Sequence, residues 1–315
     1  MNRLRLLFCG TPGFAVPSFQ KLVSSSEFEI LAAYTQPDRP RGRGQEVSLS
    51  PVKQAALTAN VPVRQPASIR LPDAEQELRR FSPDAIVIIA YGQIIPARLL
   101  DIPRLGWINL HASLLPKFRG AAPIHWAIAN GESVSGNTTM RIDAGMDTGE
   151  MLLQQALPIG PDETTPQLAE RLAQAGAQLV VDTLRGLASG QLTPRAQDSA
   201  EATLAPILKR EDGQIVWERS AKEIYNRMRG FTPWPGAYSE FRGQLCHLSA
   251  RPSSKSLSAL TPGEIHAEAG EVYVACGAAT TLHLSHVKLE GRKQVSAREF
   301  ANGARLQPGE RFGKA

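Results

Sequence analysis

Short apolar runs that end in glycine or polar residues constrain the fold of this chain most strongly. Three of them stand within the first hundred residues: LRLLFCG at 4–10, EILAAYTQ at 29–36 and DAIVIIAYG at 84–92. Because they are apolar at successive positions, they are typical of strands buried on both faces of a parallel sheet. A helical pattern, PGFAVPSFQKLVSS, follows the first run. This order of strand, turn and helix predicts a Rossmann-like α/β domain on a parallel sheet.

The segment GWINLHASLLP at residues 106–116 begins like another strand and then breaks off abruptly. Asn109 and His111 come at its end, just before SLLP leaves regular structure and PIHWAIAN starts a helix. Ligands bind in the crevice outside the carboxyl ends of parallel strands, so we expect both polar side chains there. For an Asn and a His alone, a structural role with backbone hydrogen bonds is the ordinary alternative.

A second segment, DAGMDTG at residues 143–149, lies between strand-like TTMRI and EMLLQQALPI. Its two aspartates and two glycines suit a tight backbone around a small ligand. Asn109, His111 and one of the aspartates are therefore expected to form a site. Composition alone leaves the choice between Asp143 and Asp147 open.

Taken together, these motifs resemble those of the formyltransferases that use 10-formyltetrahydrofolate. The pattern is N-x-H-x-SLLP-x-x-RG-x-x-PI followed by D-x-G-x-DTG, and further matching stretches are FCGTPGFAVPSF, TQPDRPRGRG, SPVK, AYGQIIP and GFTPWPGAY. The resemblance spans nearly the whole chain. The core pattern indicates only the superfamily, whereas FTPWPGA and the GRG loop favour the members that formylate methionyl-tRNA.

The resemblance implies a catalytic set of Asn109, His111 and Asp147. An amide such as that of Asn109 can donate a hydrogen bond to the oxyanion that develops on the formyl oxygen. His111 can donate a second hydrogen bond or carry the proton to the leaving folate nitrogen. Asp147, the aspartate of DTG, would orient the imidazole and stabilise its protonated form.

The resemblance also implies binding residues for the two substrates. The residues expected to bind folate are Tyr91, Gly92, Ile94, Ser113, Leu114, Leu115, Pro116 and Asp143. Those expected to bind tRNA are Arg39, Arg41 and Arg43, with Lys117 and Arg119 expected to meet the terminal adenosine or phosphates. The arginine-rich loop departs from its relatives, which often carry lysines after GRG, because Gln45 and Glu46 stand there instead.

Three domains or segments are predicted along the chain: a folate-binding catalytic domain at 1–188, a linker at 189–205 and a second domain at 206–315. Beyond the linker, the runs AYSEFRGQLCHLSA, GEIHAEAGEVYVACG and TTLHLSHVKLEG alternate at period two between glycine turns. This pattern predicts a small antiparallel barrel, and the resemblance implies an OB-fold-like one. Trp234, between two prolines, is predicted to pack as a rigid corner between the domains rather than to stand exposed for stacking.

The distribution of charge points to a polyanionic partner. Residues 1–205 hold 19 basic and 19 acidic side chains, whereas residues 206–315 hold 16 and 11, which accounts for the net charge of +5. A basic second domain suits tRNA because phosphate contacts dominate nucleic-acid affinity. Chance asymmetry on a solvated surface explains the charge equally well on its own.

Several other classes are excluded or disfavoured. The cysteines Cys9, Cys246 and Cys276 show neither metal-ligand nor disulfide spacing, so we expect no metal and a reducing compartment. The four histidines of the second half share no metal spacing either. GTPGFA lacks the GxGxxG pattern of NAD-binding turns. The initial apolar run is too short for a signal peptide and is better interpreted as a strand, so we expect a cytoplasmic protein. We also expect a monomer.

Three alternatives to formylation of methionyl-initiator tRNA remain open. A folate-dependent formyltransferase acting on a glycinamide nucleotide or an amino sugar would carry the same catalytic residues. A hydrolase of formyltetrahydrofolate would replace the amine by water. A non-catalytic RNA-binding protein of the same fold would bind tRNA without consuming the donor.

Overall fold

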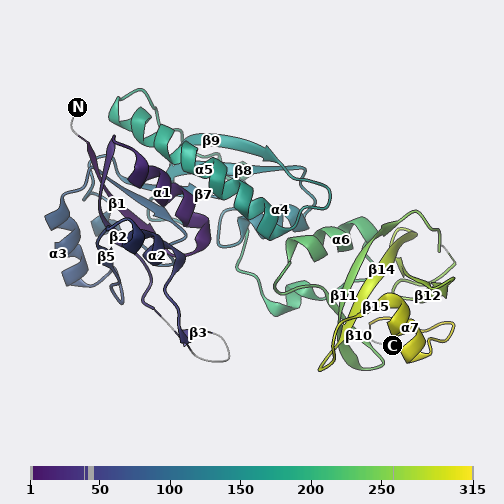
Figure 1. The fold of residues 1–315 in the computed structure, drawn as a ribbon. Coiled ribbons are helices and arrows are strands. Elements are labelled where there is room, and N and C mark those ends of the chain that lie inside the picture. Colours follow the sequence, from purple (N-terminus) through teal and green to yellow (C-terminus); the bar gives the residue numbers. More distant parts are fainter. Residues whose placement is uncertain (1–2, 39, 42–45, 258, 314–315) are drawn as a thin grey trace. The chain divides into compact units, whose positions relative to one another are not determined.

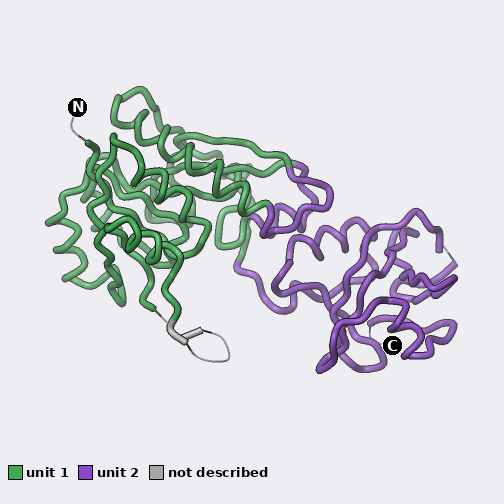
Figure 2. The backbone as a smooth tube through the Cα atoms, viewed as in Figure 1, with its two compact units in different colours: residues 1–123, 134–158, 168–206 green, residues 124–133, 159–167, 207–315 purple. Residues whose placement is uncertain are grey.

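The computed structural model describes residues 3–38, 40–41, 46–257 and 259–313. The chain divides into two compact units (Figure 2). The first unit consists of residues 1–123, 134–158 and 168–206, and the second consists of residues 124–133, 159–167 and 207–315. Two short segments from the first part of the chain therefore belong with the second unit.

The first unit is built on a seven-stranded sheet in the order β5-β2-β1-β6-β7-β8-β9 (Figure 1). The strands are β1 Leu4–Gly10, β2 Phe28–Tyr34, β5 Val63–Arg64, β6 Ala85–Ile89, β7 Trp107–His111, β8 Val134–Arg141 and β9 Met151–Pro158. The pairs from β5 to β7 are parallel, which confirms the predicted Rossmann-like sheet. Strand β8 is antiparallel to both of its neighbours, β7 and β9, so DAGMDTG is the loop of a β8–β9 hairpin.

Both faces of this sheet are buried, as the apolar runs predicted. One core takes Phe8, Val87 and Leu110, whereas Cys9 and Ile88 belong to the core on the opposite face. The helices of the unit are α1 Val16–Ser24, α2 Pro51–Thr58, α3 Pro72–Phe81 and α5 Thr165–Ala188, whose first residues belong to the second unit. Helix α5 contributes to the first core, and α3 contributes to the second. Helix α3 is mostly polar, and its acidic first turn and basic last turn complement the helix dipole.

Helix α2 begins as the sequence predicted. Ser50 is the N-cap, and its hydroxyl accepts a hydrogen bond from the backbone nitrogen of Lys53 at 3.2 Å. Pro51 fills the first helical position, where a missing N–H costs nothing. Ahead of this helix, a short hairpin pairs β3 Pro40–Arg41 with β4 Glu46–Val47.

The second unit holds the predicted antiparallel strands, in the order β10-β11-β14-β13-β12 with β15 paired to β14 (Figure 1). These strands are β10 Tyr238–Phe241, β11 Gln244–Ser253, β12 Ile265–Glu268, β13 Glu271–Cys276, β14 Thr280–Leu289 and β15 Val295–Ser296. Its helices are α6 Ala221–Gly230 and α7 Ala297–Ala304, together with α4 Pro123–Ala129 from residue 124 onward. Ser220 and Ser296 begin α6 and α7 with capping boxes.

Arg229 on α6 ties the early segments into the second unit. Its buried guanidinium donates hydrogen bonds to the carbonyl oxygens of Gly160 at 3.1 Å and Glu163 at 3.0 Å. The hydroxyl of Thr165 donates to the carbonyl of Gly230 at 2.6 Å, and the ring of Trp126 packs edge-on against Phe231. Arg229 thus satisfies backbone carbonyls that lie more than sixty residues earlier in the chain.

The prediction that Trp234 packs as a corner is wrong, because its side chain is 54% exposed. Pro235 is the buried residue of this turn, and a β-carbon on Gly213 would lie 3.1 Å from its ring. The proline therefore fills the corner in place of the indole.

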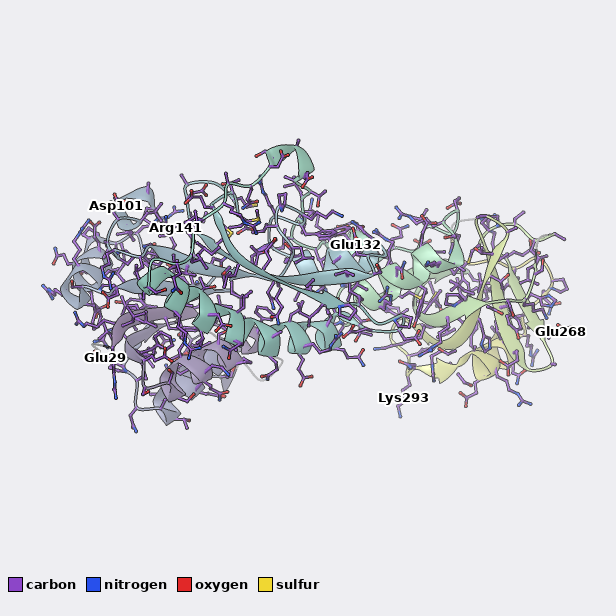
Figure 3. All side chains as sticks on the ribbon, turned by 90° about the horizontal axis from the view of Figure 1, so that it is seen from above. Glu29, Asp101, Glu132, Arg141, Glu268 and Lys293 are labelled. Atoms are coloured by element: carbon purple, nitrogen blue, oxygen red, sulfur yellow. The ribbon has the colours of Figure 1, made fainter. Side chains whose placement is uncertain are left out.

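The side chains of Glu268 and Lys293 are exposed on the second unit (Figure 3). The three cysteines are free and buried, and burial raises the pKa of Cys246 to about 12. Within the described ranges, no cluster of three or more His, Cys, Asp or Glu could hold a metal ion, and no helix is long and apolar enough to cross a membrane.

Candidate active site

Strand β7 places Asn109 and His111 on one face of the sheet, because they stand two positions apart. Asn109 pairs with Ile88 of β6 on one side and with Met140 of β8 on the other, and His111 pairs with Thr138 of β8. Asn109 is half-buried, and its carboxamide has no hydrogen-bond partner among the residues that the structure describes. This amide is therefore available to a ligand.

The imidazole of His111 is buried between a carbonyl and a carboxylate. Its Nε2 lies 2.9 Å from the carbonyl oxygen of Phe118, and its Nδ1 lies 3.6 Å from Oδ2 of Asp147. Because a carbonyl can only accept, Nε2 carries the hydrogen, and Nδ1 of the neutral ring presents a lone pair. The Asp147 carboxylate therefore lies on the side of the ring that carries the lone pair.

Asp147 is held in place by its backbone and by one strong hydrogen bond. Its φ of 53° lies in the left-handed region, and its Oδ2 accepts a hydrogen bond from the backbone nitrogen of Gly120 at 2.8 Å. Asp143 has a different task, since its carboxylate accepts from the Gly145 nitrogen at 3.0 Å and from the Thr148 hydroxyl at 2.8 Å. The structure thus directs Asp147 to His111 and uses Asp143 to shape the loop.

The backbone groups of the SLLP turn, which were expected to reach the folate, are hydrogen-bonded to side chains of β8 and β9. Thr138 donates to the carbonyl of Ser113 at 2.7 Å and accepts from the nitrogen of Leu115 at 3.0 Å, while Gln154 donates to the carbonyl of Leu115 at 2.8 Å. Leu114 and Pro116 remain half-buried. Their apolar surfaces, rather than the backbone, are what the turn offers to a ligand.

A hollow of ≈ 300 Å³ opens at the carboxyl ends of β1, β2 and β6. It is lined by Thr11, Gln36, Pro37, Asp38, Ser48, Ser50 and Gly92. The Lys53 ammonium beside Asp38 lowers the pKa of that carboxyl, so the pair adds no net charge to the hollow. Thr11 and the amide of Gln36 both donate to the carbonyl of Tyr91, at 3.2 and 3.1 Å, which joins the three strand ends.

The residues predicted at the end of β6 lie in different surroundings. Gly92, with a φ of +85°, borders the hollow, and the side chain of Ile94 is 73% exposed. The ring of Tyr91 is buried, its hydroxyl has no partner among the described residues, and burial raises its pKa. Ile94 and Gly92 can therefore meet a ligand, whereas Tyr91 supports them from within the core.

The basic residues predicted to bind tRNA lie partly within and partly outside the described residues. Arg39 and Arg43 lie outside the described residues, and Arg41 belongs to β3 by its backbone. Arg119 does not reach a solvent-exposed position, because it is 8% exposed and donates two hydrogen bonds to Gln197. Gln197 was missed, since a lone polar residue in a segment without apolar periodicity carries no signal of its contacts.

Models of known protein families match both parts of the chain. A family model described as "Formyl transferase" matches residues 3–184, and one described as "Formyl transferase, C-terminal domain" matches residues 207–305. Methionyl-tRNA formyltransferase of Koribacter versatilis is 51% identical over 98% of both chains, and that of Solibacter usitatus is 50% identical over 99% of both. The chain belongs to the methionyl-tRNA formyltransferase family.

A solved structure agrees on the fold of this formyltransferase. The sugar 3N-formyl transferase WlaRD has a TM-score of 0.65 at 16% identity, over 93% of this chain and 100% of its own. At that identity the likeness concerns the arrangement of strands and helices alone. In this formyltransferase, the Asn109 amide, which has no partner in the described part of the chain, and the His111–Asp147 pair lie at a strand end of that fold.

Proposed function

We propose that the chain transfers a formyl group from 10-formyltetrahydrofolate to the free amino group of methionyl-initiator tRNA. One observation carries the proposal: at the end of β7, an Asn109 amide without a partner among the described residues stands beside an imidazole 3.6 Å from a carboxylate. The names of relatives that are about half identical over the full length supply the substrates.

The proposed reaction follows from the needs of amide formation. The methionyl nitrogen attacks the formyl carbon, a C–N bond forms, and the carbonyl electron pair moves onto oxygen. The Asn109 amide donates a hydrogen bond to that oxyanion. Collapse of the intermediate breaks the bond to the folate nitrogen, and the proton lost by the amine reaches that leaving nitrogen.

His111 and Asp147 handle the proton in this scheme. Nδ1 of His111 takes the proton from the attacking amine, and the Asp147 carboxylate stabilises the imidazolium until the proton moves on to the leaving nitrogen. The carbonyl of Phe118, 2.9 Å from Nε2, keeps the other nitrogen protonated and the ring oriented. Positioning and charge stabilisation are enough, because the formyl donor is already activated.

We propose that the folate binds between the end of β6 and the SLLP turn. The exposed side chain of Ile94 and the half-buried surfaces of Leu114 and Pro116 offer apolar area, which a flat pterin ring can cover. Gly92 allows close approach of a ligand to the backbone, and Asp143 shapes the loop opposite. Ser113 and Leu115 hold the turn from inside.

For the tRNA, we propose that Arg39, Arg41 and Arg43 hold the acceptor stem and that the basic residues of 206–315 contact further phosphates. The excess of 16 basic over 11 acidic side chains in residues 206–315 supports this assignment. A 54% exposed Trp234 adds an aromatic surface on which a base can stack. The reaction would take place in the cytoplasm, where initiator tRNA is used.

The test is formylation by the purified full chain with 10-formyltetrahydrofolate labelled in its formyl group. We expect label in acid-precipitable methionyl-initiator tRNA and none in uncharged tRNA. Preferential formylation of glycinamide ribonucleotide or of a nucleotide-linked amino sugar would overturn the assignment of the acceptor. Donor consumption without acceptor would indicate a hydrolase, and tRNA binding without donor turnover would indicate a non-catalytic protein.

A further inference from the structure

Residues 195–205 form a strap across the two loops that surround His111. At one end, Arg195 and Met151 exchange two backbone hydrogen bonds of 2.8 and 2.9 Å. At the other end, the carbonyl of Thr203 accepts from the nitrogen of Arg119 at 2.8 Å, and the nitrogen of Ala205 donates to the carbonyl of Arg119 at 2.7 Å. The sequence had predicted only a linker here, whereas the structure makes it a joint between residues 116–122 and 147–151.

Gln197 lies within the strap and uses its side chain fully. Its amide nitrogen donates to the carbonyl oxygens of Asp147 and Gly149, both at 2.8 Å. Its amide oxygen accepts from Nε and Nη2 of Arg119, at 3.0 and 2.9 Å. One carboxamide therefore links the backbone of the aspartate loop to a buried guanidinium on the other loop.

The two loops joined in this way carry both partners of the catalytic imidazole. Phe118, whose carbonyl faces Nε2 of His111, stands directly before Arg119, and its nitrogen donates to the hydroxyl of Thr203 at 2.9 Å. The nitrogen of Gly120, which holds the Asp147 carboxylate, follows directly after Arg119. A shift of either loop would therefore change the distance between Nδ1 of His111 and Asp147.

We propose that Gln197 is a positioning residue for formyl transfer: it locks the Asp147 loop against the Phe118–Gly120 loop and so fixes the carboxylate at His111. The inference rests on the proposed function of His111 and Asp147. It assigns no contact between Gln197 and either substrate. Its effect therefore belongs to the chemical step and not to the binding of folate or tRNA.

Two substitutions separate the donated bonds from the accepted ones. Gln197→Ala removes all four hydrogen bonds. Gln197→Glu keeps the shape and strengthens the pairing with Arg119, but a carboxylate has no hydrogen to donate to the carbonyls of Asp147 and Gly149. If the only role of Gln197 were to hydrogen-bond the buried guanidinium of Arg119, the Glu variant would be as active as the natural chain.

We expect both variants to melt as cooperatively folded proteins and to lose kcat by about 10- to 100-fold, the scale of a small misplacement of catalytic groups. The KM values for methionyl-tRNA and for 10-formyltetrahydrofolate should stay within about 3-fold, as for a loss confined to the transition state. Gln178→Ala is the matched control, because its side chain lies on the surface of α5 and donates a hydrogen bond to Asp182 at 2.8 Å. This control should leave kcat unchanged.

A double-mutant cycle tests whether Gln197 acts through Asp147. In an Asp147→Asn background, Gln197→Ala should lower kcat by less than about 3-fold, because groups that act as a unit are not additive. A full additional loss in that background, or a Gln197→Glu variant with natural kcat, would overturn the proposal. If the natural chain itself forms no formyl-methionyl-tRNA, the proposed function has failed instead, and the two failures are distinct.

Discussion

At the scale of single residues, the site divides its polar groups into those already bonded and those left for a ligand. His111 has a protein partner at each ring nitrogen, whereas the described residues offer none to the carboxamide of Asn109. The strand thus presents one amide that the described residues leave unbonded and one imidazole that lies between Phe118 and Asp147.

Replacing either residue by alanine tests this division. We expect Asn109→Ala and His111→Ala to remain folded and to lose at least about 100-fold in formyl transfer, the usual scale for removing one preorganised donor. Steady-state assays with methionyl-tRNA would measure the loss. His266→Ala, a half-exposed histidine of the second unit, is the control and should retain full activity. A near-natural rate in either site variant would remove that residue from the mechanism.

Gly120 combines two constraints on one residue. Its φ is +120°, and an added β-carbon would lie 2.7 Å from the carbonyl oxygen of Ala205. We expect Gly120→Ala to lower the free energy of unfolding by roughly 1–3 kcal/mol and to reduce kcat, because the same residue donates to Asp147. Urea unfolding and a transfer assay would measure the two effects.

Gly190 provides the comparison for this prediction. Its φ of +70° is also left-handed, but nothing lies within 4 Å of an added β-carbon. Gly190→Ala should therefore cost about 1 kcal/mol from backbone conformation alone and leave kcat intact. Equal losses of activity in the two variants would argue against a role for the close contact at Gly120.

The sequence predicted residues whose positions follow a period and missed those whose contacts depend on tertiary folding. Asn109 and His111 stand two apart on a strand, so their shared face followed from the pleat alone. Asp147 came from a motif, but its proximity to His111 depends on a hairpin that the pattern did not orient. Gln197 contacts residues about fifty positions away and has no local pattern at all. Trp234 was misjudged because flanking prolines stiffen a turn without deciding which side chain is buried.

At the scale of elements, the approach of α5 to β7 depends on a glycine inside the helix. A β-carbon on Gly176 would lie 2.6 Å from Cδ2 of Leu110 and 3.2 Å from the amide nitrogen of Asn137. Leu110 stands between Asn109 and His111 on the strand. The helix can therefore rest directly on the back of the site only because this position has no side chain.

Gly176→Ala is expected to destabilise the chain, although alanine is the better helix former. Overpacking against Leu110 should cost about 1–3 kcal/mol, which exceeds the gain of about 1 kcal/mol in helix propensity. Gly303→Ala on α7 should do the opposite, since nothing lies within 4 Å of an added β-carbon there. Urea unfolding of both variants would test the predicted difference in sign, and a stabilised Gly176→Ala chain would contradict the proposed close contact.

At the scale of the whole molecule, charge and chemistry occupy different parts of the chain. The residues proposed for catalysis lie in the first unit, and basic and acidic side chains balance over residues 1–205. The positive excess lies beyond that residue, on the part that the family comparison matches to the C-terminal domain. The sequence predicted this separation, because it depends only on counting charges along the chain.

Salt should therefore affect the two substrates differently. Raising the salt concentration is expected to increase the KM for methionyl-tRNA steeply, since each neutralised phosphate adds about 0.9 to the slope of log affinity against log salt for duplexes. The KM for 10-formyltetrahydrofolate should change by less than about 2-fold over the same range, as expected for contacts other than ion pairs with a polyanion. Parallel titrations of both KM values would reveal the contrast, and equal salt slopes would argue against a polyelectrolyte contact.

The bonds of Arg229 also bear on how such enzymes can be recombined. Gly160 and Glu163 come from the portion matched to the first family model, yet their carbonyls are satisfied by a guanidinium from the second. Consider a chimaera that joins the first two-thirds of one homologue to the last third of another. Its contacts between α6 and the earlier segments would be mismatched unless residues 124–133 and 159–167 came from the same homologue as α6. These two short stretches are therefore expected to exchange together with α6 as a set.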